Sequence, residues 1–250
     1  MVKVLELQRY CDELLAAGEF EDYCPNGLQV EGLRPVRRLV TGVTASLALI
    51  EAALAAGADA ILVHHGWFWR GESPRLTGLK GWRARRLFES GASLLAYHLP
   101  LDAHPELGNN RELARVLGIE AAERTLAGKG LVWRGRLSTP VAGADLAHRI
   151  AARLDRPPLY VQGRDQPIRT LAWCSGAAQG FIEEAATLGV DAYLSGEISE
   201  STTHVARELG IDYFAAGHHA TERLGVQALG EHLVGHFGIE HSFLDIDNPA

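Results

Sequence analysis

The chain has 250 residues, of which 47% are hydrophobic and 22% are charged. This composition is typical of a globular protein with one large domain or two smaller ones. The formal net charge of −7 excludes a protein whose whole surface binds nucleic acid or anionic lipid, although a local basic patch stays compatible with it. The three cysteines form no C-x-x-C pair, as expected in a reducing compartment. Because the chain shows neither a signal peptide nor a membrane-length apolar run, we expect a soluble cytoplasmic protein.

The first elements alternate between helix and strand. Apolar residues recur at helical spacing from Val4 to Leu15, and Gly18 ends that pattern. A turn-rich loop at 22–28 leads to a strand at 39–43, a helix at about 46–56 and a strand at 60–63. A strand, helix, strand order predicts a right-handed parallel unit, in which ligands bind beyond the carboxyl ends of the strands.

The second half of the chain repeats the first. Residues 50–63 match residues 182–195 at an offset of 132, with seven identities in fourteen positions. His98 and Asp102 match His218 and Glu222 at an offset of 120. We therefore predict an α/β protein with two similar lobes, residues 1–125 and 126–250, mainly parallel sheets flanked by helices, and a metal site in the cleft between the lobes. The alternative is that any two helix and strand units look alike in Ala and Gly.

The adjacent pair His64-His65 ends the strand at 60–63. Successive side chains of an extended segment point to opposite sides, so the pair can serve two metal ions more easily than it can grip one. Partners would come from two further segments in which a histidine precedes a carboxylate by four residues, His98 to Asp102 and His218 to Glu222. Imidazole together with carboxylate favours Zn, Fe, Mn or Ni over Ca or Mg alone.

The roles within this set differ. His218 and Glu222 share one face of a predicted helix, and a carboxylate there can bridge two ions. Pro100 predicts an extended loop from His98 to Asp102, which leaves open which of the two reaches the metal. We choose Asp102 because a second anionic ligand helps to neutralise two dications. His98 is then a candidate for supporting a ligand or transferring a proton.

Two neighbouring segments have open interpretations. Trp67-Phe68-Trp69 could form a wall that stacks on a planar base, or else a hydrophobic plug or subunit contact. The stretch from Arg70 to Arg86 is rich in arginine and could receive phosphate groups, or could be a solvated helix face.

Four ordered motifs together resemble the Nif-three-like dinuclear metal centre proteins, also named GTP cyclohydrolase I type 2 homologues, and in particular their bacterial branch. The motifs are Asp22-x-x-Pro25-Asn26-Gly27-Leu28, His64-His65-Gly66, His98-Leu99-Pro100-Leu101-Asp102 with Gly108-Asn109-Asn110, and Gly217-His218-His219-Ala220-Thr221-Glu222. The resemblance implies two similar α/β lobes, a toroidal homohexamer, and metal ligands at His64, His65, Asp102, His218 and Glu222, with Glu222 as the bridge.

These observations lead to one main functional hypothesis and two alternatives. The main hypothesis is a hydrolase with two divalent metal ions and a small-molecule substrate such as a nucleotide. If the substrate is GTP, hydroxide would attack C8 of the purine and formate would leave. The first alternative is a metal-binding toroidal scaffold or regulator without catalysis. The second is a protein that associates with nucleic acid through the basic segment, which the net charge disfavours.

Overall fold

The computed structural model describes residues 1–250, which form two compact units. Unit 1 comprises Met1–Leu101 and Gly225–Asp247, and unit 2 comprises Asp102–Leu224 and Asn248–Ala250. These bounds differ from the predicted division at residue 125, because helix α10 (His218–Phe237) begins in unit 2 and ends in unit 1. Strand β11 (Glu240–Phe243) then pairs with β2 (Arg38–Thr44) of unit 1. The chain therefore contributes to unit 1 twice.

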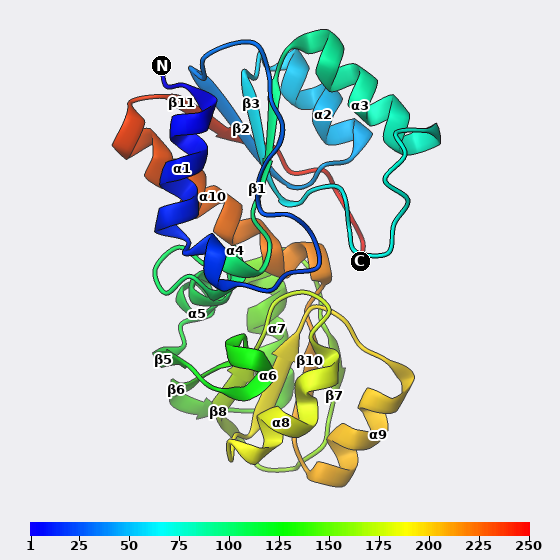
Figure 1. Cartoon of the computed structure of the whole chain (residues 1–250). Coiled ribbons are helices and arrows are strands. Elements are labelled where there is room, and N and C mark those ends of the chain that lie inside the picture. The colour runs from blue at the N-terminus through cyan, green and yellow to red at the C-terminus, as the bar shows by residue number, and fades with distance from the viewer. The chain divides into compact units, whose positions relative to one another are not determined.

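Unit 1 contains a five-stranded sheet in the order β1 (Gly27–Val30), β4 (Ser93–Ala96), β3 (Ala60–His65), β2, β11. As predicted, the sheet is mainly parallel, and only β1 runs antiparallel to its neighbour β4. Helices α2 (Leu47–Ala55) and α3 (Gly78–Ser90) cover one face, and α1 (Val4–Leu14) and the later turns of α10 lie on the other (Figure 1). None of the helices of the protein combines the length and apolarity that crossing a membrane would require.

Local signals in the sequence explain most of these elements, with one exception. The hydroxyl of Ser46 accepts a hydrogen bond from the N–H of Leu49 and so caps α2. This helix lies within the range of about 46–56 that the sequence predicted. The predicted extended loop from His98 to Asp102 is wrong, because residues Leu99–Ala103 form the short helix α4. Pro100 lies in the first turn of α4, where a backbone N–H is not needed and the fixed φ of proline suits the helix. Asp102 consequently projects from a helix.

Unit 2 contains a six-stranded sheet that is mixed. Its order is β5 (Glu120–Arg124), β6 (Trp133–Val141), β8 (Ile168–Trp173), β9 (Ala192–Ser195), β10 (Asp212–Ala215), β7 (Leu159–Val161). Only β8, β9 and β10 are parallel to one another, so the prediction of a mainly parallel sheet holds for this central part alone. Helices α5 (Asn109–Leu117) and α7 (Gly143–Leu154) pack on one core, and α8 (Ile182–Thr187) and α9 (Glu200–Leu209) on another. The short elements are η1 (Ala17–Glu19), α6 (Ala127–Gly130) and η2 (Gln179–Phe181).

The sheets of the two units have the same central topology. The order β1-β4-β3-β2 corresponds to β7-β10-β9-β8, and the first strand of each series is antiparallel to the second. The registers agree as well, because Leu39 pairs with Ala60 in unit 1 and Leu171 pairs with Ala192 in unit 2. This agreement confirms the predicted offset of 132 residues.

The pairing of β4 and of its counterpart β10 shows that the second predicted offset is wrong. Ala60 pairs with Ser93, and its counterpart Ala192 pairs with Asp212, which gives an offset of 119. The predicted value of 120 is therefore wrong by one residue, and His98 corresponds to Gly217 instead of His218. The segment that follows this strand differs in length by one residue between the repeats. A match of a few residues after the strand therefore gives a different offset from the strand itself.

Hydrogen bonds and core residues repeat together with the strands. The carboxylate of Asp59 accepts hydrogen bonds from the N–H groups of Arg37 and Arg38, and at the same offset of 132 that of Asp191 accepts them from Arg169 and Thr170. Three buried residues near helix α1 correspond at an offset of 139 to three on α7, namely Leu7, Cys11 and Leu15 with Leu146, Ile150 and Leu154. The predicted internal duplication is thus visible in topology, register and core.

Candidate metal centre

Three imidazoles gather at the carboxyl ends of two neighbouring strands in unit 1. His64 and His65 are the last residues of β3, and His98 follows the end of β4. Their ligand nitrogens all lie within 4.8 Å of one another, as is required of side chains that could hold a metal ion. The parallel register of β3 and β4 causes this convergence, because both strands end at the same edge of the sheet.

Neighbouring polar groups orient the first two rings. His64 is fully buried, and its Nδ1 lies 3.0 Å from the carbonyl oxygen of Tyr97. A carbonyl can only accept, so Nδ1 carries the proton and Nε2 carries the lone pair that a metal would need. The Nδ1 of His65 lies 3.2 Å from the hydroxyl of Thr44 on the adjacent strand β2.

The loop before β1 holds His98. The carboxylate of Asp22 lies 2.7 Å from Nδ1 of His98, and the side-chain oxygen of Asn26 accepts a hydrogen bond of 2.8 Å from the backbone N–H of His98. Burial alone would raise the pKa of Asp22, but the hydrogen bond and charge of His98, with further donors at Asn26 and Tyr23, lower it to about 2. An ionised Asp22 thus fixes the proton of His98 on Nδ1 and leaves Nε2 as the lone-pair nitrogen.

The tryptophans that follow His65 serve different purposes. Trp67 is 3% exposed and its Nε1–H donates to the carbonyl of Ala45, so it belongs to the core and not to a stacking wall. Trp69 instead lies edge-on to His98 at a ring-centroid distance of 5.0 Å. Only the last residue of the predicted wall therefore borders the imidazoles.

The positive charge of the segment from Arg70 to Arg86 is partly neutralised by neighbouring carboxylates. Lys80 forms an ion pair of 2.9 Å with Glu72, and Arg86 lies 4.0 Å from Glu51. The guanidinium of Arg70 donates to the backbone carbonyl of Asp22. These contacts support the interpretation of the segment as a solvated surface, with Arg70 tied to the loop that holds His98.

In unit 2, Asp102 is held by a polar network. It is 6% exposed, and its Oδ1 accepts hydrogen bonds from Asn109 and from the hydroxyl of Ser175, at 2.9 and 2.8 Å. The side chain of Asn110 joins the same network, because it donates to the carbonyl of Asp102 and accepts from the N–H of Ser175. The hydrogen bonds to Oδ1 thereby fix the orientation of the Asp102 carboxylate.

His218 and Glu222 lie on the first turns of α10, one helical turn apart as predicted. The Nε2 of His218 is 3.1 Å from Glu222 Oε2, and its Nδ1 is 2.7 Å from Glu197. Burial alone would lower the pKa of His218, but the hydrogen bonds and charges of Glu222 and Glu197 raise it to about 9. Asp102 and Glu222, both buried, offer carboxylate oxygens within 4.8 Å of each other.

Gly176, which follows strand β8, provides space for this carboxylate. Its φ is +65°, and a Cβ at this position would clash with Glu222 Oε1 and lie 3.2 Å from His218 Nε2. The backbone N–H of Gly176 also donates to the hydroxyl of Thr221 on α10. A residue with a side chain would therefore displace Glu222 or distort the loop.

The sequence indicated the residues of the two clusters better than the residues that support them. Each of the five predicted metal residues lies in one of two polar clusters, His64 and His65 in unit 1 and the other three in unit 2, and His98 joins the unit 1 cluster. Sequence reasoning assigned no role to five supporting residues, Asp22, Asn26, Asn109, Ser175 and Glu197. Three of them, Asp22, Asn26 and Asn109, lie in the motifs that carry the family resemblance, whereas Ser175 carried no signal by spacing. Glu197, however, is the counterpart of His65 at the offset of 132, which could have identified it.

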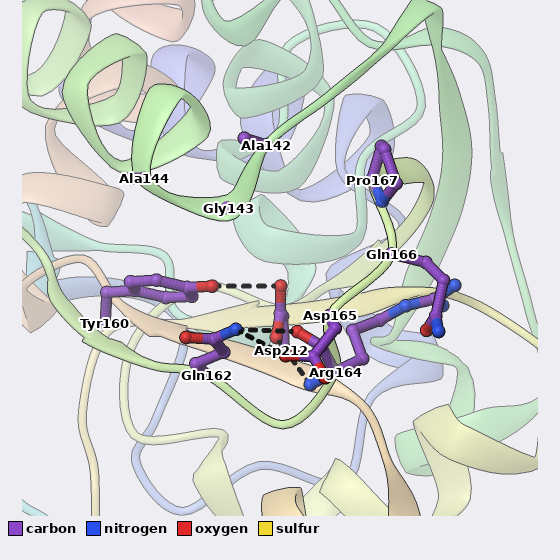
Figure 2. A pocket seen from close by; sticks show the side chains of 10 residues that line it. All are labelled: Ala142, Gly143, Ala144, Tyr160, Gln162, Arg164, Asp165, Gln166, Pro167 and Asp212. Carbon is purple, nitrogen blue, oxygen red and sulfur yellow. Dashed lines mark hydrogen bonds between the residues drawn. The ribbon is translucent and has the colours of Figure 1, made fainter.

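A separate pocket of about 220 Å³ lies in unit 2 (Figure 2). There the hydroxyl of Tyr160 donates to Asp212, at the start of β10, whereas His218 follows the end of that strand. A Cβ on Gly143 would clash with the Tyr160 hydroxyl. The counterpart of Gly143 in unit 1 is the buried Val4, so the glycine beside this pocket is not repeated in the first half.

Comparisons with known proteins agree with the fold. A family model described as Duf34/NIF3 (NGG1p interacting factor 3) matches residues 2–249. A protein of Allochromatium vinosum named GTP cyclohydrolase 1 type 2 homolog is 61% identical over 250 residues, covering 100% of this chain and 98% of the relative. A protein of Escherichia coli K12 with the same name is 50% identical, with 100% of both chains covered.

Solved structures show the same similarity. That of protein ybgI is 49% identical and superposes with a TM-score of 0.96 over 100% of both chains. That of TTHA1606 from Thermus thermophilus is 36% identical, with a TM-score of 0.90 over 98% of both chains. The chain belongs to the Duf34/NIF3 family.

Proposed function

We propose that this protein is a hydrolase with two divalent metal ions. The observation that carries the proposal is the pair of buried carboxylates, Asp102 and Glu222, with oxygens within 4.8 Å of each other. Two buried anions at this distance repel, and bound cations would offset that repulsion. The proposed ligands are His64, His65, Asp102, His218 and Glu222, with Glu222 as the bridge.

The donor set fits such ions. Imidazole nitrogens with carboxylate oxygens suit Zn, Fe, Mn or Ni. The acceptors on the far nitrogens of the rings, Tyr97 for His64 and Glu197 for His218, are of the kind that orients metal-binding histidines. We expect elemental analysis to find two metal equivalents per chain, and Glu222→Gln or His64→Gln to lower that number. Glu231→Gln, an exposed residue of α10, should leave it unchanged.

Bound divalent cations would supply Lewis acidity, which polarises a substrate oxygen and lets water attack at neutral pH. The side chains of the protein would orient the reacting groups and transfer protons. Asp22 keeps the proton of His98 on Nδ1, so that Nε2 can accept a proton from water or return one to a leaving group. The ring of Trp69 packs perpendicular to that of His98, whose side chain is 13% exposed, and this burial would limit the access of water to the imidazole.

The relatives' name makes GTP the first substrate to test, and the ring of Trp69 could stack on its base. We expect the metal-loaded protein to release formate from GTP, and Glu222→Gln to abolish the release. If no formate or altered purine forms, the GTP assignment fails, and a screen of amides and phosphoesters tests the hydrolase class. A protein that keeps two metals and turns over no substrate class would instead be the alternative, a metal-binding scaffold or regulator.

We further propose that the chain assembles as a homohexamer. Supporting this proposal, Trp82 and Phe88 on α3 are 60% and 59% exposed, more than is usual for aromatic side chains of a monomer. Light scattering should give a mass six times the 27.1 kDa of one chain. A monomeric mass would contradict the proposal.

A further inference from the structure

Two buried hydroxyls meet the backbone carbonyl of Glu197, the residue whose carboxylate lies 2.7 Å from Nδ1 of His218. The hydroxyl of Tyr213 on β10 lies 2.6 Å from this carbonyl oxygen, and that of Ser195 at the end of β9 lies 2.9 Å from it. The two hydroxyls also contact each other. Because both residues are fully buried and a carbonyl can only accept, at least one of the two hydroxyl protons points to Glu197.

The first repeat has no such hydroxyls. Its corresponding positions carry two fully buried apolar residues, Val63 and Leu94. The carbonyl of His65, the counterpart of Glu197, accepts a hydrogen bond of 2.8 Å from the backbone N–H of Ala45 instead. The fold therefore accepts apolar side chains at both positions, and the hydroxyl pair belongs only to the repeat in which a carboxylate contacts a histidine.

The backbone before Glu197 is fixed as well. The N–H of Gly196 donates to the carbonyl of Gly176 at 2.8 Å, and the carbonyl of Gly196 accepts from the N–H of Gly217 at 2.9 Å. The side chain of Glu197 is 41% exposed, and an ion pair with such an exposed side chain gains little unless the motion of that side chain is restricted. Hydrogen bonds on both sides of its Cα supply this restriction.

We propose that Tyr213 and Ser195 are positioning residues, which hold the carbonyl of Glu197 so that its carboxylate stays hydrogen-bonded to the Nδ1–H of His218. The inference rests on the proposed function, in which His218 binds a metal ion through Nε2. A carboxylate on the far nitrogen sets the orientation of a metal-binding imidazole. The two hydroxyls would thereby act on the metal centre without touching it.

The test follows the Nδ1–H of His218 by proton–nitrogen NMR in protein freed of metal by a chelator. The signal is identified through its loss in His218→Gln, and its exchange with water measures how firmly Glu197 holds the proton. We expect Tyr213→Phe to speed this exchange about fivefold, the equivalent of one neutral hydrogen bond. Ser195→Ala should act in the same direction, which keeps the test valid if Tyr213→Phe fails to fold.

Tyr193→Phe is the matched control, because this equally buried tyrosine of β9 donates to the carbonyl of Ala178 at 2.8 Å. It should leave the exchange unchanged. Glu197→Ala removes the acceptor, so adding Tyr213→Phe to it should speed the exchange no further. Equal exchange in Tyr213→Phe and Tyr193→Phe, or additive effects of Tyr213→Phe and Glu197→Ala, would overturn the proposal.

A separate measurement of metal binding distinguishes this proposal from the proposed function. We expect Tyr213→Phe to weaken the binding of Zn²⁺ about tenfold, as is typical when the support of a metal-binding histidine is lost. Unchanged affinity would show that holding His218 does not serve metal binding. A wild-type protein that binds no metal would refute the proposed function, whereas the exchange measurements would still decide whether the hydroxyls position Glu197.

Discussion

Asp22 Oδ1 lies 2.7 Å from Nδ1 of His98, across 76 residues of sequence. The same carboxylate accepts hydrogen bonds from the backbone N–H groups of Tyr23 and Leu99 and from the side chain of Asn26. Four donors converge on one anion whose side chain is 3% exposed. The loop at 22–28 therefore acts as a clamp that sets both the position of His98 and the nitrogen that carries its proton.

Replacing the carboxylate should loosen that clamp. Asp22→Asn brings an NH₂ group against a donor, and we expect it to lower the free energy of unfolding by about 1–3 kcal/mol. The nitrogen chemical shifts of His98, identified through the loss of its signals in His98→Gln, should change from a single tautomer to a mixture. Urea denaturation measures the first effect. A destabilised variant that keeps a single tautomer would show that Asp22 supports the loop without orienting the ring.

Asp191 should govern part of the stability in acid. Burial alone would raise its pKa, but hydrogen bonds from Thr170 and Arg169 and the charge of Arg164 lower it. A carboxyl with a depressed folded pKa stabilises the protein above its unfolded pKa of roughly 3.9, and that contribution is lost as the pH falls through the folded pKa. We expect Asp191→Asn to be less stable than wild type at pH 7 and the difference to shrink in acid.

Urea denaturation at a series of pH values measures this difference. Asp165→Asn, which changes an exposed carboxylate of the same unit, is the control and should follow wild type at each pH. A constant gap between Asp191→Asn and wild type across the acid range would contradict the assigned role.

Gly176 should be less tolerant of a side chain than Gly180, four residues away. A Cβ on Gly176 would clash with Glu222, and the positive φ adds about 1–2 kcal/mol of backbone strain for any other residue. We expect Gly176→Ala to lower both the stability and the bound metal. Gly180→Ala meets no atom within 4 Å and should change neither, as thermal unfolding and elemental analysis would show. Full metal content in Gly176→Ala would remove Glu222 from the proposed ligands.

The sequence predicted the residues that form the two clusters, the parallel strand, helix, strand unit and the internal repeat. The ends of these strands are visible in the sequence because the apolar runs end abruptly at Val63 and Ala216. The contacts of Ser175 and of Asn109, which lies in one of the quoted motifs, were not predictable, because both residues act on Asp102 through hydrogen bonds that depend on tertiary packing. The helix around Pro100 was missed because proline permits a helix start as well as a loop.

The two indole rings near His65 should respond differently to truncation. Trp67→Phe leaves the carbonyl of Ala45 without its donor and opens a void, at a cost of about 1–3 kcal/mol. Trp69→Phe should change the stability by less than about 0.5 kcal/mol, because the side chain is only half-buried. Urea denaturation distinguishes them, and a larger loss for Trp69→Phe would reverse the assignment.

The two repeats have diverged at the strand exits. Where the first repeat ends its second strand with His64-His65, the corresponding residues of the second are Gly196-Glu197, and His98 corresponds to Gly217. A Cβ on Gly196 would lie 2.7 Å from Cα of His218, so a histidine there is incompatible with the start of α10. The second repeat therefore cannot present a histidine pair at this strand end, and neither half could be exchanged for the other.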